Sequence, residues 1–469
     1  MKIVAFSLNP LFANKVNGGG TRNLQKVVTH LGQLGHDVRV LSTARGDTNE
    51  PFQWHPNVTV EPCLRFKQPF PGPYEISHHD MAFNIQVLGD ALMDADRFYL
   101  HDGEWLCPHV HDSIPTVVSL RDNVYPESML GGFNFRADTL IAISPYSRDL
   151  YLATIGRSNR NVVERLRTIP NGIDAEFFSY QPPSPTLLEF LRFNPAGRRV
   201  VLHPHRPESS KGMWQTIDVA QRLVFDKGVD NLSVLVPMWF DVDISEEVSD
   251  FYESVKNGID ERGLTANFHF HPWLPQELIA QYYSLGEVTL ALGHFVEAFG
   301  NVPYESMSCG TPAVVARVAT HRSLMPDELV DKVDYNDVDA ALERTYEILR
   351  SKARTSAPAL AYIREQFGVE RQLDDYADAI VNAEFSTPRG PIHRPLTVHT
   401  RYKLAPWCYQ SGPSSVYHDF RAEHVEMPAL TSLLAQTPTP TARSAEREGV
   451  DRREFESWYE EGFTSPLVG

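Results

Sequence analysis

Short apolar segments alternate with longer amphipathic segments through most of this chain, and the alternation begins a second time near residue 198. At the start, Lys2–Ser7 has the composition of a strand and Thr21–Leu34 that of a helix, which Gly35 ends. The next strand is expected at Asp37–Ser42. Strands and helices that alternate in this way build parallel sheets covered by helices. The sequence therefore predicts an α/β protein with two doubly wound domains.

The other predicted elements follow the same alternation of strands and helices. In the first half, the further strands are expected at Arg97–His101, Thr116–Leu120 and Thr139–Ser144. In the second half, strands are expected at Arg199–His203, Leu232–Val236, Asn267–His271, Val288–Leu292 and Ala313–Ala316, and helices at Gly212–Phe225 and Glu246–Arg262. Ligands of open α/β sheets bind at the carboxyl ends of the strands, so a cleft is expected there.

Changes in composition divide the chain into four segments. We predict a first domain at residues 1–180, a second at 195–365, a helix at 366–386 that returns toward the first domain, and an extension at 387–469. Prolines and the stretch Thr437–Thr441 indicate that the extension is irregular. One terminal helix is expected at Asp451–Gly462, with Phe455, Trp458 and Tyr459 on its apolar side. The extension carries no recognisable chemical signature.

Charge and cysteine content limit the functional classes. The formal net charge of −17 argues against a nucleic-acid or anionic-membrane surface, because such surfaces depend on lysine and arginine. The four cysteines are scattered, as is usual for free thiols in a reducing compartment. No apolar run has the length of a membrane span, and the first residues form a strand and not a signal peptide. A cytoplasmic protein is therefore expected.

The segment from Glu297 to Glu305 is the most informative for chemistry. Seven residues separate the two carboxylates, and a turn at Gly300 lies between them. The second carboxylate is predicted to open a short helix that Gly310 caps. Carboxylates accept hydrogen bonds from sugar and ribose hydroxyls, and backbone N–H groups at a helix start bind phosphate. This segment could therefore hold a sugar, a diphosphate and a ribose together.

Two other stretches could bind phosphate. The glycines Gly18–Gly20 precede a helix and let the backbone approach a ligand, although a flexible loop explains them equally well. Arg206 and Lys211 follow the first strand of the second half, and two cations there suit a diphosphate. A solvated basic turn is the alternative for that stretch.

Taken together, these motifs resemble a known family. The early glycine loop, the connection Pro170–Asp174, the Arg206 and Lys211 pair and the E-x7-E segment occur in the order typical of family 4 glycosyltransferases. The resemblance runs from residue 1 to about 385. It implies a GT-B fold, with two Rossmann-like domains facing a cleft, and a retaining enzyme that uses a nucleotide-diphosphate sugar. The irregular extension lies outside it.

The resemblance also implies roles for individual residues. Glu305 would accept the ribose hydroxyls, Glu297 would contact the transferred sugar, and Arg206 with Lys211 would neutralise the leaving diphosphate. The donor would also be bordered by Gly19, Gly20, Trp273, Leu274 and the backbone of Phe299, Gly300, Asn301 and Val302. Fixed cations and N–H donors stabilise the charge that develops on the diphosphate, so neither a metal nor a further cofactor is expected.

One position departs from the family pattern. Where the family usually carries a histidine, this chain has Arg121, which cannot titrate as histidine would. His101, at the end of the preceding predicted strand, is a candidate for the missing imidazole, and an ordinary strand-end histidine is the alternative. The segment that follows has a composition suited to metal binding but not the spacing, and Glu104 with Trp105 would suit a sugar acceptor better.

The expected activity is transfer of a sugar, with UDP favoured by the family as the donor nucleotide, to a hydroxyl of a small molecule or glycan. The alternatives are a GT-B nucleotide-sugar epimerase, a phosphorylase or a non-catalytic scaffold. The scaffold is disfavoured because the four charged site residues are all present. The net charge disfavours a modified-DNA acceptor. The donor sugar, the acceptor and the oligomeric state are open at this point.

Overall fold

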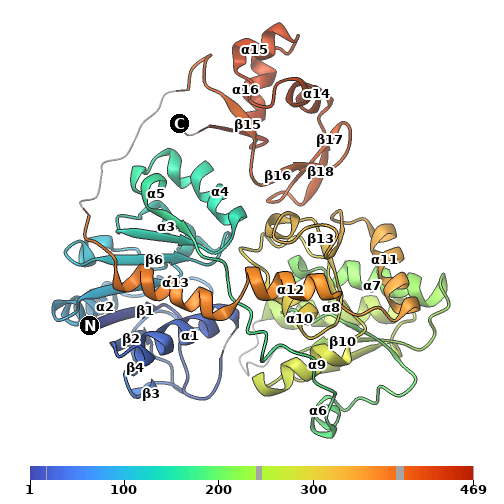
Figure 1. The fold of residues 1–469 in the computed structure, drawn as a ribbon, viewed down its shortest axis with the longest axis horizontal. Coiled ribbons are helices and arrows are strands. Elements are labelled where there is room, and N and C mark those ends of the chain that lie inside the picture. Colours follow the sequence, from blue (N-terminus) through green and yellow to red (C-terminus); the bar gives the residue numbers. More distant parts are fainter. Residues whose placement is uncertain (17, 207, 239–245, 387–395, 468–469) are drawn as a thin grey trace. The chain divides into compact units, whose positions relative to one another are not determined.

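The computed structural model describes residues 1–16, 18–206, 208–238, 246–386 and 396–467. The chain forms two compact units (Figure 1): a first unit of Met1–Pro170 with Glu370–Gly469, and a second unit of Asn171–Val369. The sequence prediction placed residues 171–180 in the first domain, whereas here they group with the second unit. The reason is local pairing, because the Ile173 N–H donates to the Phe367 carbonyl at 2.6 Å and Ile173 bridges to Gly368.

The first unit contains an eight-stranded sheet in the order β3-β4-β2-β1-β5-β6-β7-β8. Neighbouring strands are parallel except β3 and β4. The strands are β1 (Lys2–Ser7), β2 (Asp37–Thr43), β3 (Phe52–His55), β4 (Val58–Leu64), β5 (Arg97–His101), β6 (Thr116–Leu120), β7 (Thr139–Ala142) and β8 (Leu166–Thr168). All five residues of β6 are buried, as expected for a strand covered on both faces.

Helices cover this sheet. They are α1 (Gly19–Gln33), α2 (His78–Met93), α3 (Pro126–Phe133), α4 (Pro145–Ala153), α5 (Arg160–Arg165) and α13 (Val369–Val381), with short 3-10 turns η1 (Pro108–His111) and η2 (Ile155–Arg157). From α13, Tyr376, Ala377 and Ile380 join the buried core formed by β1 and α1. The late helix thus completes the first unit, although residues 169–368 separate it from β8.

The second unit has a six-stranded parallel sheet in the order β11-β10-β9-β12-β13-β14. Its strands are β9 (Arg199–Leu202), β10 (Leu232–Pro237), β11 (Phe268–His271), β12 (Val288–Ala291), β13 (Ala313–Ala316) and β14 (Asp331–Val333). The longer helices are α7 (Met213–Phe225), α8 (Glu246–Glu261), α11 (Val338–Ser351) and α12 (Ala357–Gln366). The shorter elements are α6 (Pro185–Leu191), η3 (Ser209–Lys211), η4 (Gln276–Leu278), α9 (Ile279–Leu285), α10 (Asn301–Ser308) and η5 (Ala319–Arg322).

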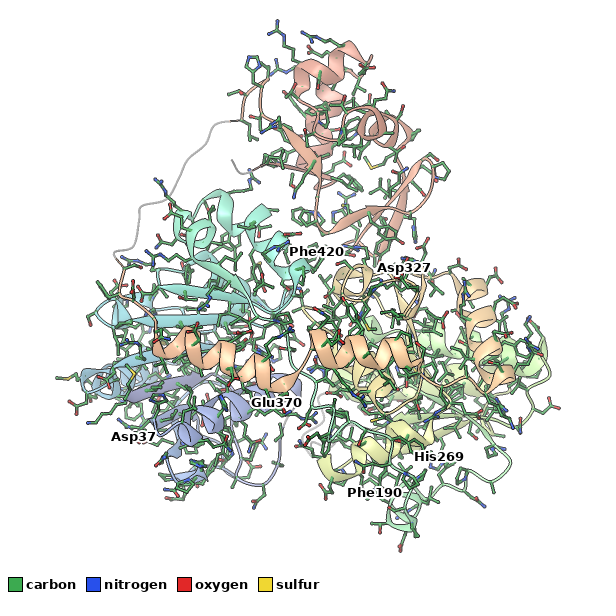
Figure 2. The ribbon with its side chains drawn as sticks, in the orientation of Figure 1. Asp37, Phe190, His269, Asp327, Glu370 and Phe420 are labelled. Carbon is green, nitrogen blue, oxygen red and sulfur yellow. The ribbon has the colours of Figure 1, made fainter. Side chains whose placement is uncertain are left out.

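Side chains tie the smaller elements to this sheet (Figure 2). His269 of β11 donates from Nε2 to the Leu191 carbonyl at 2.7 Å, which fixes the end of α6 against the edge strand. The apolar residues of β9, β10 and β12 pack against α7 in one buried core. The second unit therefore has its own hydrophobic core.

Residues 396–467, which we call the C-terminal module, are more ordered than the sequence suggested. Strand β15 (Tyr402–Leu404) pairs with β19 (Thr464–Pro466), and β16 (Cys408–Gln410), β17 (Ser415–His418) and β18 (Glu423–Glu426) form a second antiparallel sheet. The helices are α14 (Pro428–Gln436), α15 (Ala442–Arg447) and α16 (Arg452–Glu460). The module has a core of its own that includes Phe455 and Trp458, on the apolar side predicted for the terminal helix. Strands of three or four residues are too short to show a readable periodicity, so the sequence read as irregular.

Candidate functional site

Two loops leave the same edge of the second unit's sheet. Strands β9 and β12 are parallel neighbours, so the loops that follow them start side by side. The Ser210 carbonyl accepts hydrogen bonds from the N–H groups of His294, at 2.8 Å, and Phe295, at 3.0 Å. A Cβ on Gly212 would lie 2.4 Å from the backbone nitrogen of Gly293. Only glycine permits this approach, which brings the predicted cation and the first predicted carboxylate together.

Lys211 and Glu297 form an ion pair at this edge. Lys211 Nζ lies 2.8 Å from Glu297 Oε1 and 3.4 Å from the centroid of the Phe295 ring. The side chain of Lys211 is 9% exposed and that of Glu297 is 26% exposed. Burial alone would raise the pKa of Glu297, but the charge and hydrogen bond of Lys211, helped by Arg206, outweigh burial and hold that pKa below its ordinary value. Glu297 is therefore a carboxylate at neutral pH, suited to accept hydrogen bonds and not to donate a proton.

The turn at Gly300 leads directly into helix α10. Gly300 has a φ of 73°, and a Cβ there would lie 2.5 Å from His321 Cε1. The helix begins at Asn301, so the prediction that Glu305 opens it is wrong. Pro303 fits the first turn of a helix, where its missing N–H is not needed. The N-cap residue of α10, Gly300, has no side chain that could accept from the first backbone N–H groups of the helix, so a ligand there could accept from them.

Glu305 lies in the middle of α10. It is 9% exposed, and the Tyr283 hydroxyl donates to its Oε2 at 3.2 Å. Tyr283 itself is buried on α9. The carboxylate is thus held in one orientation by a neighbouring helix, and sequence reasoning did not identify this tyrosine.

Two buried histidines stand beside the ion pair. His205 donates from Nε2 to the Leu290 carbonyl at 2.9 Å, and His321 Nδ1 lies 2.8 Å from the Tyr304 hydroxyl. Burial lowers the pKa of each imidazole to about 4, against a smaller opposing effect of Glu297. Both rings are therefore neutral at pH 7. His205 lies inside the stretch that the sequence singled out, whereas nothing in the pattern around His321 pointed to it.

The remaining predicted donor residues lie on loops at this edge. Arg206 follows β9, and its Nε lies 3.1 Å from Glu208 Oε1. Its positive charge also helps to lower the pKa of Glu297. Trp273 and Leu274 follow β11 and are partly buried. Because every strand of this sheet is parallel, these residues lie at the same carboxyl edge as the ion pair.

The first unit places the other predicted residues at its own carboxyl edge. Gly19 and Gly20 are the first residues of α1. His101 donates from Nε2 to the Gly20 carbonyl at 3.0 Å, and the Tyr99 hydroxyl lies 2.8 Å from His101 Nδ1. Burial, and then the charge of Arg121, lower the pKa of His101 well below its ordinary value. His101 is thus a neutral ring that fixes the glycine loop, with both ring nitrogens already engaged.

Arg121 is buried at the end of β6. Its backbone N–H donates to Asp102 Oδ1 at 2.9 Å, and its Nη1 donates to the Tyr376 hydroxyl at 2.9 Å. Trp105 is 2% exposed and packs against Phe6, with ring centroids 5.4 Å apart. The expectation that Trp105 faces an acceptor is therefore wrong.

Glu104, which the sequence analysis paired with Trp105 as an acceptor contact, is buried as well. Burial raises its pKa well above the ordinary value, and the nearby charge of Asp102 raises it further. Across the described residues, no three histidine, cysteine or acidic side chains gather as a metal site would require. That the reaction is independent of metal nevertheless stays a prediction. None of the described helices combines the length and apolar character needed to cross a bilayer.

Comparison with known proteins assigns both domains. Residues 17–177 match the Glycosyltransferase Family 4 model, and residues 192–355 match the Glycosyl transferases group 1 model. A D-inositol 3-phosphate glycosyltransferase of Thermomonospora curvata is 34% identical over 134 residues, which are 27% of this chain and 31% of that protein. One from Thermobifida fusca is 29% identical over 136 residues, which are 28% of this chain and 31% of that protein. The chain thus spans about a third of the length of the curated relatives it matches.

Solved structures give the fold. Sucrose-phosphate synthase from Thermosynechococcus elongatus superposes with a TM-score of 0.63 at 18% identity, covering 80% of this chain and 96% of that one. Anabaena HepE in complex with UDP and glucose superposes with a TM-score of 0.62 at 20% identity, covering 81% and 99%. At these identities the likeness establishes architecture alone. The chain therefore has the GT-B fold, and its first and second domains match the Glycosyltransferase Family 4 and the Glycosyl transferases group 1 models, respectively.

Proposed function

We propose that this protein is a retaining glycosyltransferase that moves a sugar from a nucleotide-diphosphate sugar to an acceptor hydroxyl. The observation that carries the proposal is the meeting of Lys211, Glu297 and the uncapped start of α10 at one sheet edge. A cation and free N–H donors suit a diphosphate, and an ionised carboxylate beside them suits a sugar hydroxyl. Both family models support a transferase.

The donor roles follow from this arrangement. Lys211 and Arg206 balance the diphosphate charge, and the backbone of Phe299, Gly300, Asn301 and Val302 donates to it or to the sugar. Glu305 accepts the ribose hydroxyls from a position fixed by Tyr283. Trp273 and Leu274 border the base. The contact of Gly19 and Gly20 with the donor, which the family resemblance implies, stays a prediction. UDP is the proposed nucleotide, since HepE is described with UDP and glucose.

The chemistry is charge stabilisation. The bond between the anomeric carbon and the diphosphate oxygen breaks, and its electron pair stays on that oxygen. The acceptor oxygen forms a bond to the same face of the carbon, and its proton passes to the departing phosphate. Lys211 and the α10 N–H donors bind the leaving group more tightly as its charge grows, which lowers the barrier. Because Glu297 is held as a carboxylate, it positions the sugar and does not act as an acid.

The proposed acceptor is a small hydroxyl-bearing molecule, and a phosphorylated polyol is the first to test. The curated relatives are named for D-inositol 3-phosphate, and two of the solved structures are named for the synthesis of sugar phosphates. In the first unit, Arg121 and His101 support the carboxyl edge through Tyr376 and Gly20. We assign them positioning roles on the acceptor side.

A cytoplasmic location, expected from the scattered cysteines, also stays a prediction.

Calorimetry tests the donor site. We expect UDP to bind, and Glu305→Ala and Lys211→Met each to weaken that binding about tenfold or more, since each removes a hydrogen bond to or from a charged group. Glu343→Ala and Lys227→Met are matched controls, because these two residues form an ion pair away from the site. If UDP, GDP and dTDP all fail to bind the wild-type protein, the donor site is wrong.

Turnover assays distinguish a transferase from an epimerase and a phosphorylase. A transferase needs an acceptor, and NMR of its product would show the donor's anomeric configuration retained. Release of free nucleotide without an acceptor would favour the epimerase, and dependence on inorganic phosphate would favour the phosphorylase. Turnover in the presence of a chelator supports a metal-independent reaction, whereas strict dependence on an added divalent ion contradicts it.

A further inference from the structure

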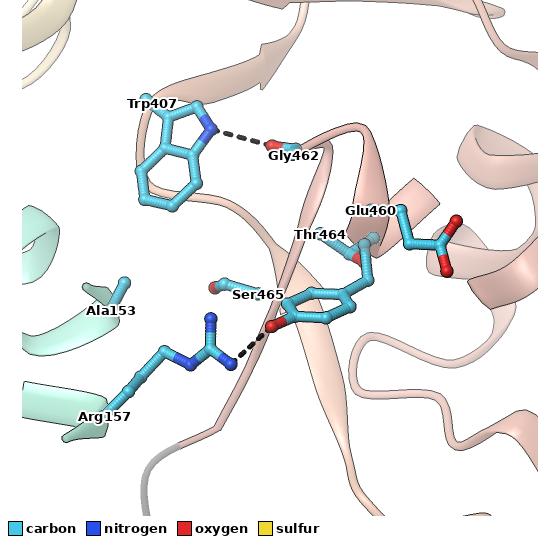
Figure 3. Close-up of a pocket in the computed structure, with 8 residues that line it drawn as sticks. Ala153, Arg157, Trp407, Glu460, Gly462, Thr464 and Ser465 are labelled. Carbon is cyan, nitrogen blue, oxygen red and sulfur yellow. Dashed lines mark hydrogen bonds between the residues drawn. The ribbon is translucent and has the colours of Figure 1, made fainter. Parts of the chain in front are cut away.

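A cavity of about 240 Å³ lies in the first unit, between the C-terminal module and the segment formed by α4 and η2 (Figure 3). At ~30 Å³ per water, this volume holds about eight waters or one small organic molecule. The lining residues are Ala153, Arg157, Trp407, Tyr459, Glu460, Gly462, Thr464 and Ser465. Both family matches end before the module begins, so neither assigns it a role.

Arg157 supplies a cation to this cavity. Its guanidinium donates one hydrogen bond to the Tyr459 hydroxyl, and the guanidinium carbon lies 5.0 Å from the centroid of that ring. Within the described ranges of the chain, no carboxylate forms an ion pair with Arg157. Glu460 borders the cavity, but Figure 3 shows its carboxylate turned away from the guanidinium. A half-buried guanidinium that forms no ion pair within the described ranges keeps N–H donors that an external anion could accept.

Two lining residues carry buried hydroxyls. Thr464 and Ser465 lie on β19, and each is 2% exposed. Neither side-chain oxygen has a hydrogen-bond partner among the residues that the structure describes. Figure 3 shows the Ser465 hydroxyl directed between Arg157 and Ala153. Buried hydroxyls without partners carry a desolvation cost that a bound acceptor group would relieve.

An aromatic wall completes the cavity. The Trp407 indole donates from Nε1 to the Gly462 carbonyl at 2.7 Å, which fixes the ring. With its only polar atom engaged, the ring presents an apolar surface, and Ala153 is a second apolar residue of the lining. A ligand here therefore meets hydrogen-bond donors on one side and an apolar wall on the other.

We propose that this cavity binds a small organic anion, a phosphate monoester or a carboxylate. Its anionic group accepts hydrogen bonds from Arg157 and Ser465, and its carbon skeleton packs against Trp407. Since η2 belongs to the Rossmann-like domain and β19 to the module, the bound anion also joins the module to that domain. This assignment does not depend on the proposed transferase activity.

Calorimetry of the full chain tests it, with glucose 6-phosphate and gluconate as anionic probes and glucose as the neutral one. The background is Lys211→Met, which removes the cation of the proposed donor site. We expect at least one anion to bind this background with a stoichiometry of one to one. Glucose should bind at least about tenfold more weakly than that anion, or not at all. Adding Arg157→Gln should weaken anion binding about tenfold or more, and Arg157→Lys should restore part of it. Arg160→Gln is the matched control, because Arg160 pairs with Glu164 at 2.8 Å outside the cavity.

Three results would overturn the proposal: no anion binds the Lys211→Met background, glucose binds as tightly as the anions, or Arg157→Gln leaves binding unchanged. Circular dichroism confirms that each variant is folded. If Arg157→Gln does not fold, Ser465→Leu provides the same test, because the larger side chain fills the cavity and should abolish binding. Anion binding that survives Ser465→Leu would likewise refute the site.

Discussion

At the scale of single residues, the Lys211 and Glu297 pair is the centre of the candidate site. Its geometry depends on neighbours that hold two loops together, namely the Ser210 carbonyl and the Gly212–Gly293 approach. Breaking one member leaves the other charged and partly buried, which is costly. The pair therefore stabilises the loops in addition to its proposed role in donor binding.

We predict that Glu297→Gln lowers the free energy of unfolding by about 1–3 kcal/mol at pH 7.5. The folded-state pKa of Glu297 is lowered from an ordinary value of 4.5, so the stabilisation is fully present above pH 4.5 and is lost as pH falls through the folded pKa. Urea unfolding at pH 8, 6.5 and 5.5 should therefore give the same difference between variant and wild type. If the stability difference between variant and wild type changes between pH 8 and 5.5, the loss of stability involves a titrating histidine and not the Glu297 carboxylate alone. Glu343→Gln, in an exposed pair, should cost less than about 1 kcal/mol.

A second prediction concerns Gly300, whose φ is 73°. Gly300→Ala should destabilise the protein by about 2 kcal/mol or more, because alanine is strained at positive φ and its Cβ would meet His321. It should also weaken UDP binding, since α10 would shift at its start. Gly89→Ala is the control: Gly89 lies inside α2 with open space around it, so alanine there should raise stability by up to ~1 kcal/mol. Equal effects of the two changes, measured by thermal unfolding and calorimetry, would contradict this account.

The sequence singled out the charged residues of the candidate site but not the residues that hold them in place. Arg206, Lys211, Glu297 and Glu305 occur at motif spacings, which a single sequence can reveal. Tyr283 and His321 come from elements whose packing beside the site depends on tertiary structure. The start of α10 was misplaced because a proline in the first turn reads as a helix breaker unless the preceding glycine turn is known.

At the scale of elements, most of the parallel strands were predicted from the sequence, whereas β3, β4, β8 and β14 were not. The structure has β1, β5, β6 and β13 at the predicted residues, because strands buried on both faces are continuous apolar runs bounded by turns. The edge strand β3 and the helix α2 were not predicted. Half-exposed segments such as β3 carry a weaker pattern, and the module's strands are too short to carry one.

At this scale, the attachment of helix α13 to the first unit can be tested. The Tyr376 hydroxyl accepts a hydrogen bond from Arg121 Nη1 at 2.9 Å and lies 2.9 Å from Ser119 Oγ, so it attaches the helix to the end of β6. Tyr376→Phe should cost about 1–3 kcal/mol, because it leaves a buried guanidinium group with one fewer acceptor. Tyr362→Phe is the control, since that hydroxyl makes a 3.3 Å bond at a partly exposed position. Chemical unfolding of both variants decides the matter, and a negligible effect of Tyr376→Phe would show that apolar packing alone holds α13.

At the scale of the whole molecule, buried histidines should make the two units differ in how much stability each loses at acidic pH. In the second unit, burial lowers the pKa of His205, His271 and His321 to about 4 and that of His203 well below its ordinary value. In the first unit, the strongly lowered imidazoles are His101 and His111. An unfolded chain protonates histidine near pH 6.5 while these folded rings stay neutral, so stability is lost as pH falls below 6.5.

The size of the effect follows from the number of rings. Between pH 6.5 and 5.5, each such histidine costs its unit about 1 kcal/mol, so the second unit should lose on the order of 4 kcal/mol and the first on the order of 2. Hydrogen exchange followed by mass spectrometry at pH 7.5 and 5.5, corrected for intrinsic rates, should show β9, β10 and β12 losing more protection than β1, β5 and β6. His271→Gln should reduce the loss in the second unit by about 1 kcal/mol, since it removes one titrating ring. If both sheets lose protection equally, or if the first unit opens first, then carboxylates and not buried histidines determine how stability falls at acidic pH.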